Sequence, residues 1–458
     1  MAVVAPFRGI RYNPDKIVNL EEVVTPPYDV INEEEGASFL DRNPYSMIQL
    51  DLRNTSQDGG SEEGRYQDAK TRFDQWQEES VLIRDEEPAI YLYYIDYTHP
   101  SGRRLTRKGL VALVGLAEFA EGIVKPHEKT FDGVIADRLE LMDECRAQFS
   151  QVFSLYPDPE QFAISVLEKS RDPEPVCVTR DLHDNVHTLW RVTDPGALSL
   201  VHDFFADRPV YIADGHHRYT TALACRRRAL ERDPDLPPDS PFNFIMMYLC
   251  ASEDEGLSVL PTHRLVRWPG RHDADQVVER LQAGFDVREI RGGTRETLVG
   301  ELLDRMDEAN DGTLSVFGFY HAGEDRAFLL KMLEGAADDP HLAGRPEVLR
   351  RLDVVVLSDL LLAGCLGLDH QQCLRQKLVS YFSDPDEALD VAVKASIADD
   401  GATPLLFLLN PTPVQQVLQV ADSGEIMPHK STYFYPKILT GLLINKLDGR
   451  EPIIPART

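Results

Sequence analysis

The stretch VYIADGHHRYTTALACRRRAL, residues 210–230, is the part of the sequence from which the fold is best approached. Val210–Ala213 is an apolar run with the composition of a short strand, and Asp214-Gly215 is a turn dipeptide. The residues that follow, His216–Leu230, are mostly good helix formers. The sequence therefore predicts a strand, a glycine turn and the first turns of a helix.

Two hypotheses fit the polar residues of this stretch. The start of a helix directs backbone N–H groups at one point, which is a generic anion site, and Arg218 adds a bidentate partner for phosphate oxygens. Alternatively, Asp214 is a helix cap, and His216 and His217 are ordinary surface side chains. Zinc is disfavoured because it needs three or four ligands and adjacent histidines point to different sides of a helix. The spacing leaves both hypotheses open.

The composition argues against several classes of protein. The 458 residues exceed the usual size of a single core, so more than one subdomain is expected. A formal net charge of -28 opposes binding to nucleic acids and anionic membranes. The six cysteines form no CxxC pair, and the apolar start of the chain is too short for a signal peptide. We expect a cytoplasmic protein with a small-molecule substrate and neither a nucleic-acid nor a membrane partner.

Hairpin and helix patterns are mixed without regular βαβ alternation, which predicts an α+β fold with mixed sheets and packed helices. An exposed loop is predicted over 54–64, and the Pro-rich segment 233–243 is the best candidate for a boundary. The predicted parts are an N-terminal α/β part (1–109), a phosphate-binding core (110–235) and a C-terminal α/β part completing the cleft (236–458). The individual elements expected are hairpins over 89–119 and 314–333, strands in 242–251, 257–268 and 405–409, and helices over 65–82, 352–368, 412–424 and 438–444.

A candidate general base lies in IVKPHEKTFDGVIADRLEL, residues 123–141. Glu128 follows a predicted strand by a short loop, where a carboxylate could accept a proton, and His127 and Lys129 could assist it. The alternative is a solvated turn.

A candidate phosphate-binding segment lies near the C-terminus, in GEIMPHKSTYFYPKILTGLL, residues 424–443. Lys430 stands beside the hydroxyls of Ser431 and Thr432, a combination typical of phosphate binding, but the Walker A spacing is absent. The alternative is a C-terminal segment of packed aromatic residues.

Two shorter motifs offer further polar groups. TPPYDVI (25–31) carries Tyr28 and Asp29, and PTHRL (261–265) carries His263 and Arg264. Polar clusters that each follow a short strand are expected when strand ends meet at one cleft.

Seven motifs, in the order PFRGIRYNP, TPPYDVI, PHEKT, DRLEL, ADGHHRYTTAL, PTHR and MPHKSTYFYPK, identify the chain as resembling the prokaryotic family called domain of unknown function 1015, nearly end to end. ADGHHRYTTA also resembles, more distantly, the phosphate-binding loop of the ParB and sulfiredoxin superfamily, most closely its free-serine kinase branch. His216 stands where sulfiredoxin needs a cysteine, which excludes sulfiredoxin chemistry. The DNA-binding helical domain and basic surface of ParB-type clamps are not visible in the sequence.

The second resemblance implies a nucleotide-binding core over roughly residues 110–230 and a role for each candidate residue. Phosphate or nucleotide binding is expected from Gly215, His216, His217, Arg218, Thr221, Lys430, Ser431 and Thr432. Glu128 is expected to deprotonate the acceptor, with His127 and Asp214 as further catalytic candidates. Acceptor binding is expected from Arg8, Tyr28, Asp29, His263 and Arg264.

The function expected from these motifs and the resemblance is nucleotide-dependent phosphoryl transfer to a small hydroxyl metabolite, best a kinase of free L-serine. ATP or ADP would be the donor, with Mg²⁺ bridging its phosphates. One alternative is a phosphatase acting on phosphoserine or a similar ester, and the other is a nucleotide-binding switch protein without catalysis.

Overall fold

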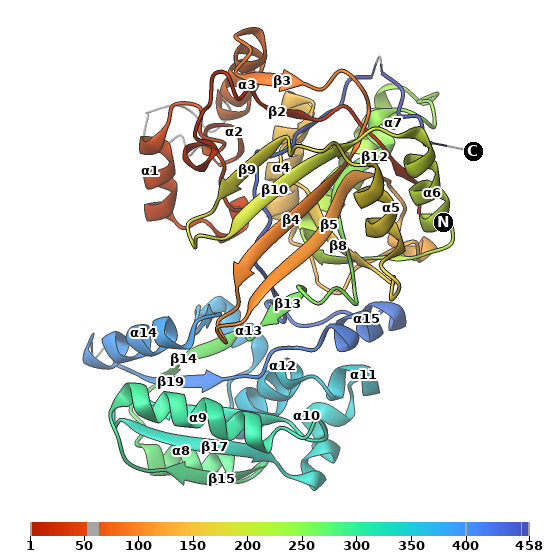
Figure 1. Cartoon of the computed structure of the whole chain (residues 1–458). Coiled ribbons are helices and arrows are strands. Elements are labelled where there is room, and N and C mark those ends of the chain that lie inside the picture. The colour runs from red at the N-terminus through yellow and green to blue at the C-terminus, as the bar shows by residue number, and fades with distance from the viewer. Residues whose placement is uncertain (1, 53–63, 399–400, 450, 457–458) are drawn as a thin grey trace. The chain divides into compact units, whose positions relative to one another are not determined.

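A computed structural model of the protein describes residues 2–52, 64–398, 401–449 and 451–456 (Figure 1). The chain divides into two units: unit 1 comprises Met1–Pro126, Thr130–Ser258 and Pro436–Thr458, and unit 2 comprises His127–Lys129 and Val259–Tyr435. Residues 54–63 of the predicted exposed loop lie outside the described residues. Within the described residues, no helix is both long and apolar enough to cross a membrane.

Unit 1 is built on a nine-stranded sheet with the order β6-β11-β8-β12-β5-β4-β10-β9, and β1 lies beside β5. β11 runs parallel to β6, and β12 parallel to β8, whereas the other neighbours are antiparallel. The strands are β1 (Val4–Ala5), β4 (Ile90–Thr98), β5 (Arg104–Gly115), β6 (Val124–Lys125), β8 (Val152–Tyr156), β9 (Cys177–Arg180), β10 (Val186–Val192), β11 (Val210–Asp214) and β12 (Phe244–Ala251). The mixed sheet confirms the predicted α+β class.

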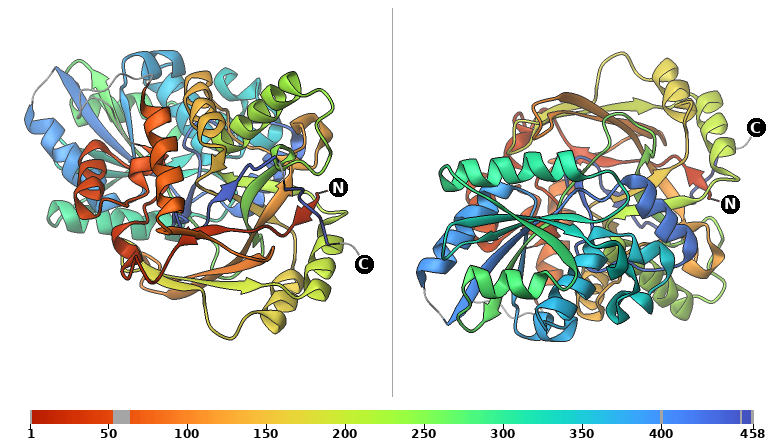
Figure 2. Two further views of the ribbon diagram at one scale, coloured as in Figure 1. Left: turned by 90° about the horizontal axis from the view of Figure 1, so that it is seen from above. Right: turned by 90° about the horizontal axis from the view of Figure 1, so that it is seen from below.

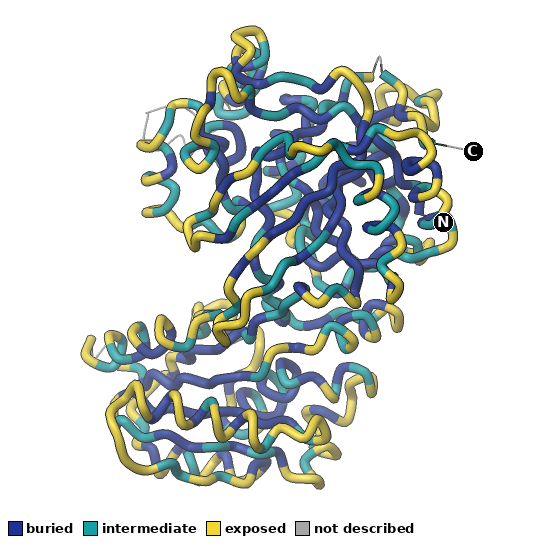
Figure 3. The backbone as a smooth tube through the Cα atoms, viewed as in Figure 1, coloured by how far each residue is buried: buried dark blue, intermediate teal, exposed yellow. Residues whose placement is uncertain are grey.

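Three helices cover one face of this sheet and form the main core of unit 1. The apolar side chains of α5 (Phe162–Ser170), α6 (Pro195–Phe205) and α7 (His216–Arg232) pack against alternate residues of the strands. β8 and β12 are accordingly buried along their length, whereas β4 and β5 have exposed residues near the turn that joins them (Figure 3). The other elements of unit 1 are α1 (Glu33–Arg42), α2 (Ile48–Asp51), α3 (Arg65–Glu78), α4 (Asp132–Cys145), β2 (Ile10–Tyr12), β3 (Leu82–Arg84), β7 (Ala147–Gln148), β21 (Asn445–Lys446) and the short 3₁₀ turns η1 (Leu20–Glu22), η2 (Tyr28–Val30), η5 (Phe119–Glu121) and η6 (Pro241–Asn243).

Unit 2 contains a six-stranded antiparallel sheet with the order β15-β17-β16-β19-β14-β18. α9 and α14 pack on one face of it (Figure 2). The sheet strands are β14 (His263–Pro269), β15 (Phe285–Ile290), β16 (Val316–His321), β17 (Arg326–Met332), β18 (Val379–Phe382) and β19 (Ala402–Leu408). The helices are α8 (Ala274–Leu281), α9 (Arg295–Ala309), α10 (Pro340–Ala343), α11 (Glu347–Arg350), α12 (Asp353–Val355), the π-helix η8 (Val356–Cys365), α13 (His370–Arg375), α14 (Pro385–Ala398) and α15 (Val414–Ser423), with the 3₁₀ turn η7 (Glu334–Asp338) and the short strands β13 (Ser258–Leu260) and β20 (Tyr433–Tyr435).

Most elements predicted from the sequence are confirmed. Both hairpins form, as β4–β5 and β16–β17, and the predicted strands correspond to β12, β13, β14 and β19. The helix predicted over 65–82 forms as α3, which ends at Glu78 and buries Ala69, Phe73 and Trp76. The apolar segment 352–368 is helical, as α12 and η8, and α15 ends before Gly424.

The helix predicted over 438–444 is wrong. The backbone of this segment bonds to distant parts of the chain: the Thr440 N–H donates to the Thr25 carbonyl at 2.8 Å, and the Ile444 N–H to the Ile10 carbonyl of β2 at 2.8 Å. Gly441 has a φ of +97°, outside helical geometry. Glycine costs about 1 kcal/mol within a helix, so tertiary bonds readily replace helical ones here.

The segment 233–243, predicted as a boundary, precedes β12, which lies between β8 and β5 in the sheet of unit 1. The division between the two units falls later in the sequence, between Ser258 and Val259.

Asp254, just after β12, gives the first testable prediction. Burial raises its pKa from 3.8 to about 6, although the N–H groups of Lys108 and Gly256 donate to its carboxylate. A raised pKa favours the folded state only while the group is protonated, so this contribution is complete below pH 3.8 and is lost as the pH rises through about 6. Across that window we expect the free energy of unfolding of the wild type to fall by about 3 kcal/mol relative to that of Asp254→Asn.

Urea unfolding of both proteins near pH 4 and near pH 8 measures this effect. The stability of the Asn variant relative to the wild type should increase at the higher pH. A difference that is the same at both pH values would contradict the raised pKa.

Candidate functional site

The 210–230 stretch folds as the predicted strand, turn and helix. β11 ends at Asp214, Gly215 forms the turn, and α7 begins at His216. Gly215 has a φ of +93°, and a Cβ atom there would lie 2.8 Å from the Arg218 Nε. Only glycine satisfies both conditions without strain. The turn therefore directs the first N–H groups of α7 out of the helix, as an anion site requires.

Asp214 lies between two cations beside the start of α7. Its Oδ1 accepts a bond from Lys437 Nζ at 3.1 Å, and its Oδ2 accepts one from the Arg218 guanidinium at 2.6 Å. Burial alone would raise the pKa of Asp214, but Lys437 and Arg218 outweigh it and hold the pKa well below the usual range. Asp214 is therefore ionised at neutral pH. The residue that caps α7 is Gly215, so the interpretation of Asp214 as the helix cap is wrong.

Arg218 is buried and bonded to the protein itself. Its guanidinium donates to the Gln151 carbonyl as well as to Asp214, and only 6% of the residue is exposed. Asp29 and Tyr28 also interact with it electrostatically. In this arrangement Arg218 fixes the Asp214 carboxylate and the glycine turn.

The two histidines at the start of α7 are not solvated surface side chains. His216 is buried. His217 stacks on Phe131 with ring centroids 5.7 Å apart, and its Nε2 accepts the Phe131 N–H at 3.0 Å. Because Nε2 accepts a bond, the neutral ring carries its proton on Nδ1.

Of the remaining candidates in unit 1, Tyr28 and Thr221 lie near Arg218, whereas Arg8 has other partners. Tyr28 lies next to Arg138, whose guanidinium is 4.5 Å from the Tyr28 ring centroid, and burial together with Asp29 raises the pKa of Tyr28 well above its usual value. Thr221 is fully buried and lines a small cavity of about 40 Å³ with Tyr28 and Arg218. Arg8 pairs with Glu451 at 3.3 Å and donates to the Asp85 carbonyl at 2.8 Å.

In unit 2, Glu128 is held by the segment that follows α15. The Met427 N–H donates to the His127 carbonyl at 2.8 Å, so the two segments run side by side. Glu128 Oε1 lies 2.9 Å from His429 Nδ1 and accepts the Lys430 N–H at 3.2 Å. One carboxylate oxygen is thus fixed by an imidazole and a backbone amide. This is the arrangement of a positioned acid or base.

His429 is a residue that the sequence analysis did not single out. It stands next to Lys430 in the quoted MPHKST motif, and this position is the only signal in the sequence that could have pointed to it. Its partner Glu128 is 301 positions away along the chain.

Lys430 and its two neighbouring hydroxyls form part of a tightly bonded loop. Lys430 has a φ of +57°, and its carbonyl accepts a bond from Arg264 at 3.0 Å. The Ser431 hydroxyl donates to the Pro428 carbonyl at 2.5 Å, and the Thr432 hydroxyl lies 3.3 Å from His127 Nε2. These hydroxyls stabilise the loop that presents the Lys430 N–H to Glu128.

His263 and Arg264 lie on β14 beneath this loop. His263 is buried, its Nδ1 accepts the Leu409 N–H at 3.1 Å, and burial together with Arg264 lowers its pKa to about 4. It is therefore neutral at physiological pH. Burial lowers the pKa of Arg264 to about 10, and its guanidinium lies 4.9 Å from the Tyr381 ring centroid.

A Mg²⁺ site is not evident from the side chains. The described part of the chain contains no group of three or more His, Cys, Asp and Glu side chains placed to hold a metal ion. Asp214 bonds to two cations, one through each oxygen, so it does not fit a Mg²⁺ ligand. We assign no step to a metal.

Most of the sequence candidates thus form two clusters, each within one unit. The unit 1 cluster contains Asp214, Gly215, His216, His217, Arg218, Tyr28 and Asp29, with Lys437 as an addition. The unit 2 cluster contains His127, Glu128, Lys430, Ser431, Thr432 and Arg264, with His429 as an addition. Together they define an α+β protein with a glycine turn at a helix start and a carboxylate fixed by an imidazole.

The chain belongs to the family described as "Protein of unknown function (DUF1015)", whose model matches residues 4–355. This confirms the family resemblance seen in the motifs. A comparison with curated proteins gives no match.

Several solved structures are distantly similar. A conserved hypothetical protein from Pyrococcus furiosus has 15% sequence identity and a TM-score of 0.33, covering 72% of this chain and 94% of that chain. Free serine kinase in complex with AMP has 13% identity and a TM-score of 0.33, covering 71% and 90%. A mutant of free serine kinase in complex with ADP has 12% identity and a TM-score of 0.33, covering 71% and 91%. These TM-scores and identities are too low to transfer a fold or an activity to this chain.

Proposed function

We propose that this protein is a nucleotide-dependent phosphotransferase that acts on a small hydroxyl metabolite, with free L-serine as the best candidate and ATP or ADP as the donor. The observation that carries the proposal is the glycine turn at the start of α7, with Lys437 and Arg218 beside it. The partial positive charge at the start of a helix attracts phosphate even in a chain with a net charge of -28.

In unit 1, the proposal assigns the nucleotide phosphates to the first turn of α7. Gly215 lets the phosphates approach the backbone, and the N–H groups of His216 and His217 donate to their oxygens. Arg218 acts as a positioning residue because its guanidinium holds Asp214. Lys437 adds positive charge at the same point. Tyr28 and Asp29, adjacent to Arg218, are proposed to contact the acceptor.

In unit 2, the proposal assigns Glu128 as the general base. Glu128 takes the proton of the acceptor hydroxyl while the acceptor oxygen attacks the terminal phosphorus and the shortened nucleotide leaves. His429 and the Lys430 N–H hold one Glu128 oxygen in place. The Lys430 side chain is proposed to neutralise phosphate charge, and Arg264 to support the loop that carries it.

Phosphorus NMR of the purified protein with ATP or ADP, magnesium and a panel of hydroxy amino acids tests the function. We expect a new phosphate ester signal, strongest with L-serine. Release of free phosphate from phosphoserine without nucleotide would instead identify a phosphatase. A nucleotide-dependent rise in melting temperature with neither reaction would identify a binding protein without catalysis.

A further inference from the structure

Unit 2 contains a pocket of about 380 Å³, formed mainly by the π-helix η8, α13 and β18. Its volume is within the range of small-molecule sites. All but two of its lining residues follow residue 355, where the match to the family model ends. The lining residues are Arg264, Val354, Leu357, Ser358, Leu362, Leu368, His370, Cys373, Leu374, Lys377, Val379, Ser380, Tyr381, Pro428 and His429.

The charge of this lining is opposite to that of the chain. Acidic residues make up 76 of the 458 residues, about one in six, yet none of the described residues that line the pocket is acidic. The lining instead carries Arg264 and Lys377, with the imidazoles of His370 and His429. Such a pocket attracts anions and repels cations.

The buried charge of Arg264 points in the same direction. Only 5% of this residue is exposed, and its guanidinium donates to the Thr262 and Lys430 carbonyls and lies over the Tyr381 ring. These partners are neutral, so the positive charge lacks a carboxylate among them. An anion in the pocket would supply the opposite charge that a buried cation otherwise lacks.

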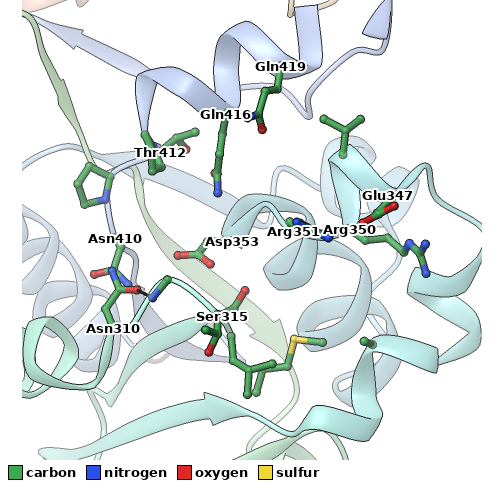
Figure 4. A pocket seen from close by; sticks show the side chains of 18 of the residues that line it. Asn310, Ser315, Glu347, Arg350, Arg351, Asp353, Asn410, Thr412, Gln416 and Gln419 are labelled. Atoms are coloured by element: carbon green, nitrogen blue, oxygen red, sulfur yellow. Dashed lines mark hydrogen bonds and ion pairs between the residues drawn. The ribbon is translucent and has the colours of Figure 1, made fainter.

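The larger cavity of unit 2 shows that this absence of acids is specific. That cavity, of about 1350 Å³, is lined by residues of both charges, including Glu347, Asp353, Arg350 and Arg351 (Figure 4). Amide side chains line it as well, and the Asp353 carboxylate bonds to Ser315 and Asn410. Neutral polar and charged groups are therefore mixed there, whereas the smaller pocket combines cations with an apolar wall.

The apolar wall of the smaller pocket is formed by the leucines and valines of η8 and its neighbours. Leu357 and Leu362 of η8 are buried, and Leu374 at the end of α13 is 50% exposed. Leu374 thus adds apolar surface to the wall of this pocket.

We propose that this pocket binds an amphipathic anion, with its apolar or aromatic body on the leucine wall and its carboxylate or phosphate group beside Arg264 and Lys377. The proposal concerns binding alone and does not depend on the phosphotransferase activity. Two sources share this chemistry, an apolar carboxylate and a nucleoside monophosphate.

Calorimetric titration of the full chain with octanoate, octylamine and AMP tests the proposal. We expect octanoate to bind with one equivalent, octylamine not to bind, and Lys377→Glu to weaken octanoate binding roughly tenfold, because an exposed attraction becomes a repulsion. Lys394→Glu, the same change at an exposed lysine of α14, is the matched control and should bind as the wild type does. Ser358→Trp, which fills the pocket, should abolish binding.

The outcomes separate the sources and can overturn the proposal. If AMP displaces octanoate and Lys377→Glu weakens the binding of both compounds, the natural ligand is a nucleoside monophosphate. If octanoate binds and AMP does not compete with it, the natural ligand is an apolar carboxylate. The proposal would be overturned if octanoate and octylamine bound equally well, or if neither octanoate nor AMP bound. It would also be overturned if Lys377→Glu and Lys394→Glu lost the same octanoate affinity. Octanoate binding is measured without nucleotide or acceptor, so a failed phosphotransferase assay does not affect this result.

Discussion

Replacing Asp214 with alanine is expected to lower the free energy of unfolding by about 3–5 kcal/mol, because it leaves two buried cations without their shared carboxylate. Lys437 and Arg218 each bond to one oxygen of Asp214, and both side chains are largely buried. Urea unfolding at neutral pH, followed by circular dichroism, measures the loss. Asp203→Ala, which removes an exposed carboxylate of α6, should change stability by less than about 0.5 kcal/mol.

The pH dependence of this loss provides a second test. The pKa of Asp214 lies below its ordinary value of 3.8, so its contribution to stability is fully present above that pH and is lost only as the pH falls further. The difference between wild type and Asp214→Ala should therefore be constant between about pH 5 and pH 8. A loss no larger than that of Asp203→Ala would show that the two cations do not depend on Asp214.

Changing Glu128 to glutamine is expected to reduce the rate of phosphoryl transfer by roughly 10²–10⁴-fold while leaving nucleotide affinity unchanged. Glutamine keeps an oxygen that can accept the bonds from His429 and the Lys430 N–H, but it cannot take a proton at neutral pH. Initial rates from phosphorus NMR and nucleotide dissociation constants from calorimetry measure the two effects separately.

Glu387→Gln, the same change at an exposed residue of α14, is the matched control and should retain full activity. Full activity in Glu128→Gln would remove Glu128 from its assigned role. If the wild type transfers no phosphate to any acceptor, the phosphotransferase proposal itself fails.

Features set by neighbouring residues could be predicted from the sequence. The β11–Gly215–α7 unit follows from an apolar run, a turn dipeptide and a series of helix formers, all within 21 residues. The two hairpins were predictable for the same reason, since each pairs strands across a short turn. The candidate base Glu128 was also found, but only as a carboxylate near a predicted strand end.

The segment 438–444 shows why local patterns are not sufficient. Its apolar composition suits a helix, yet its backbone bonds to Thr25 and Ile10, which lie more than 400 positions earlier in the sequence. Bonds of this kind depend on where the strands of unit 1 lie, and a local propensity worth a fraction of a kcal/mol per residue does not outweigh them.

By itself, the sequence determined the α+β class, the family, and the strand, glycine turn and helix of residues 210–230, because each depends on short-range patterns or motifs. Only the tertiary structure decided what these residues contact. Lys437 reaches Asp214 across 223 positions, and His429 reaches Glu128 across 301. Folding alone brings such side chains together, because their pairing depends on sheet order and burial rather than on neighbours in the chain. Asp214 thereby became the shared partner of two cations, and Glu128 a carboxylate fixed by an imidazole.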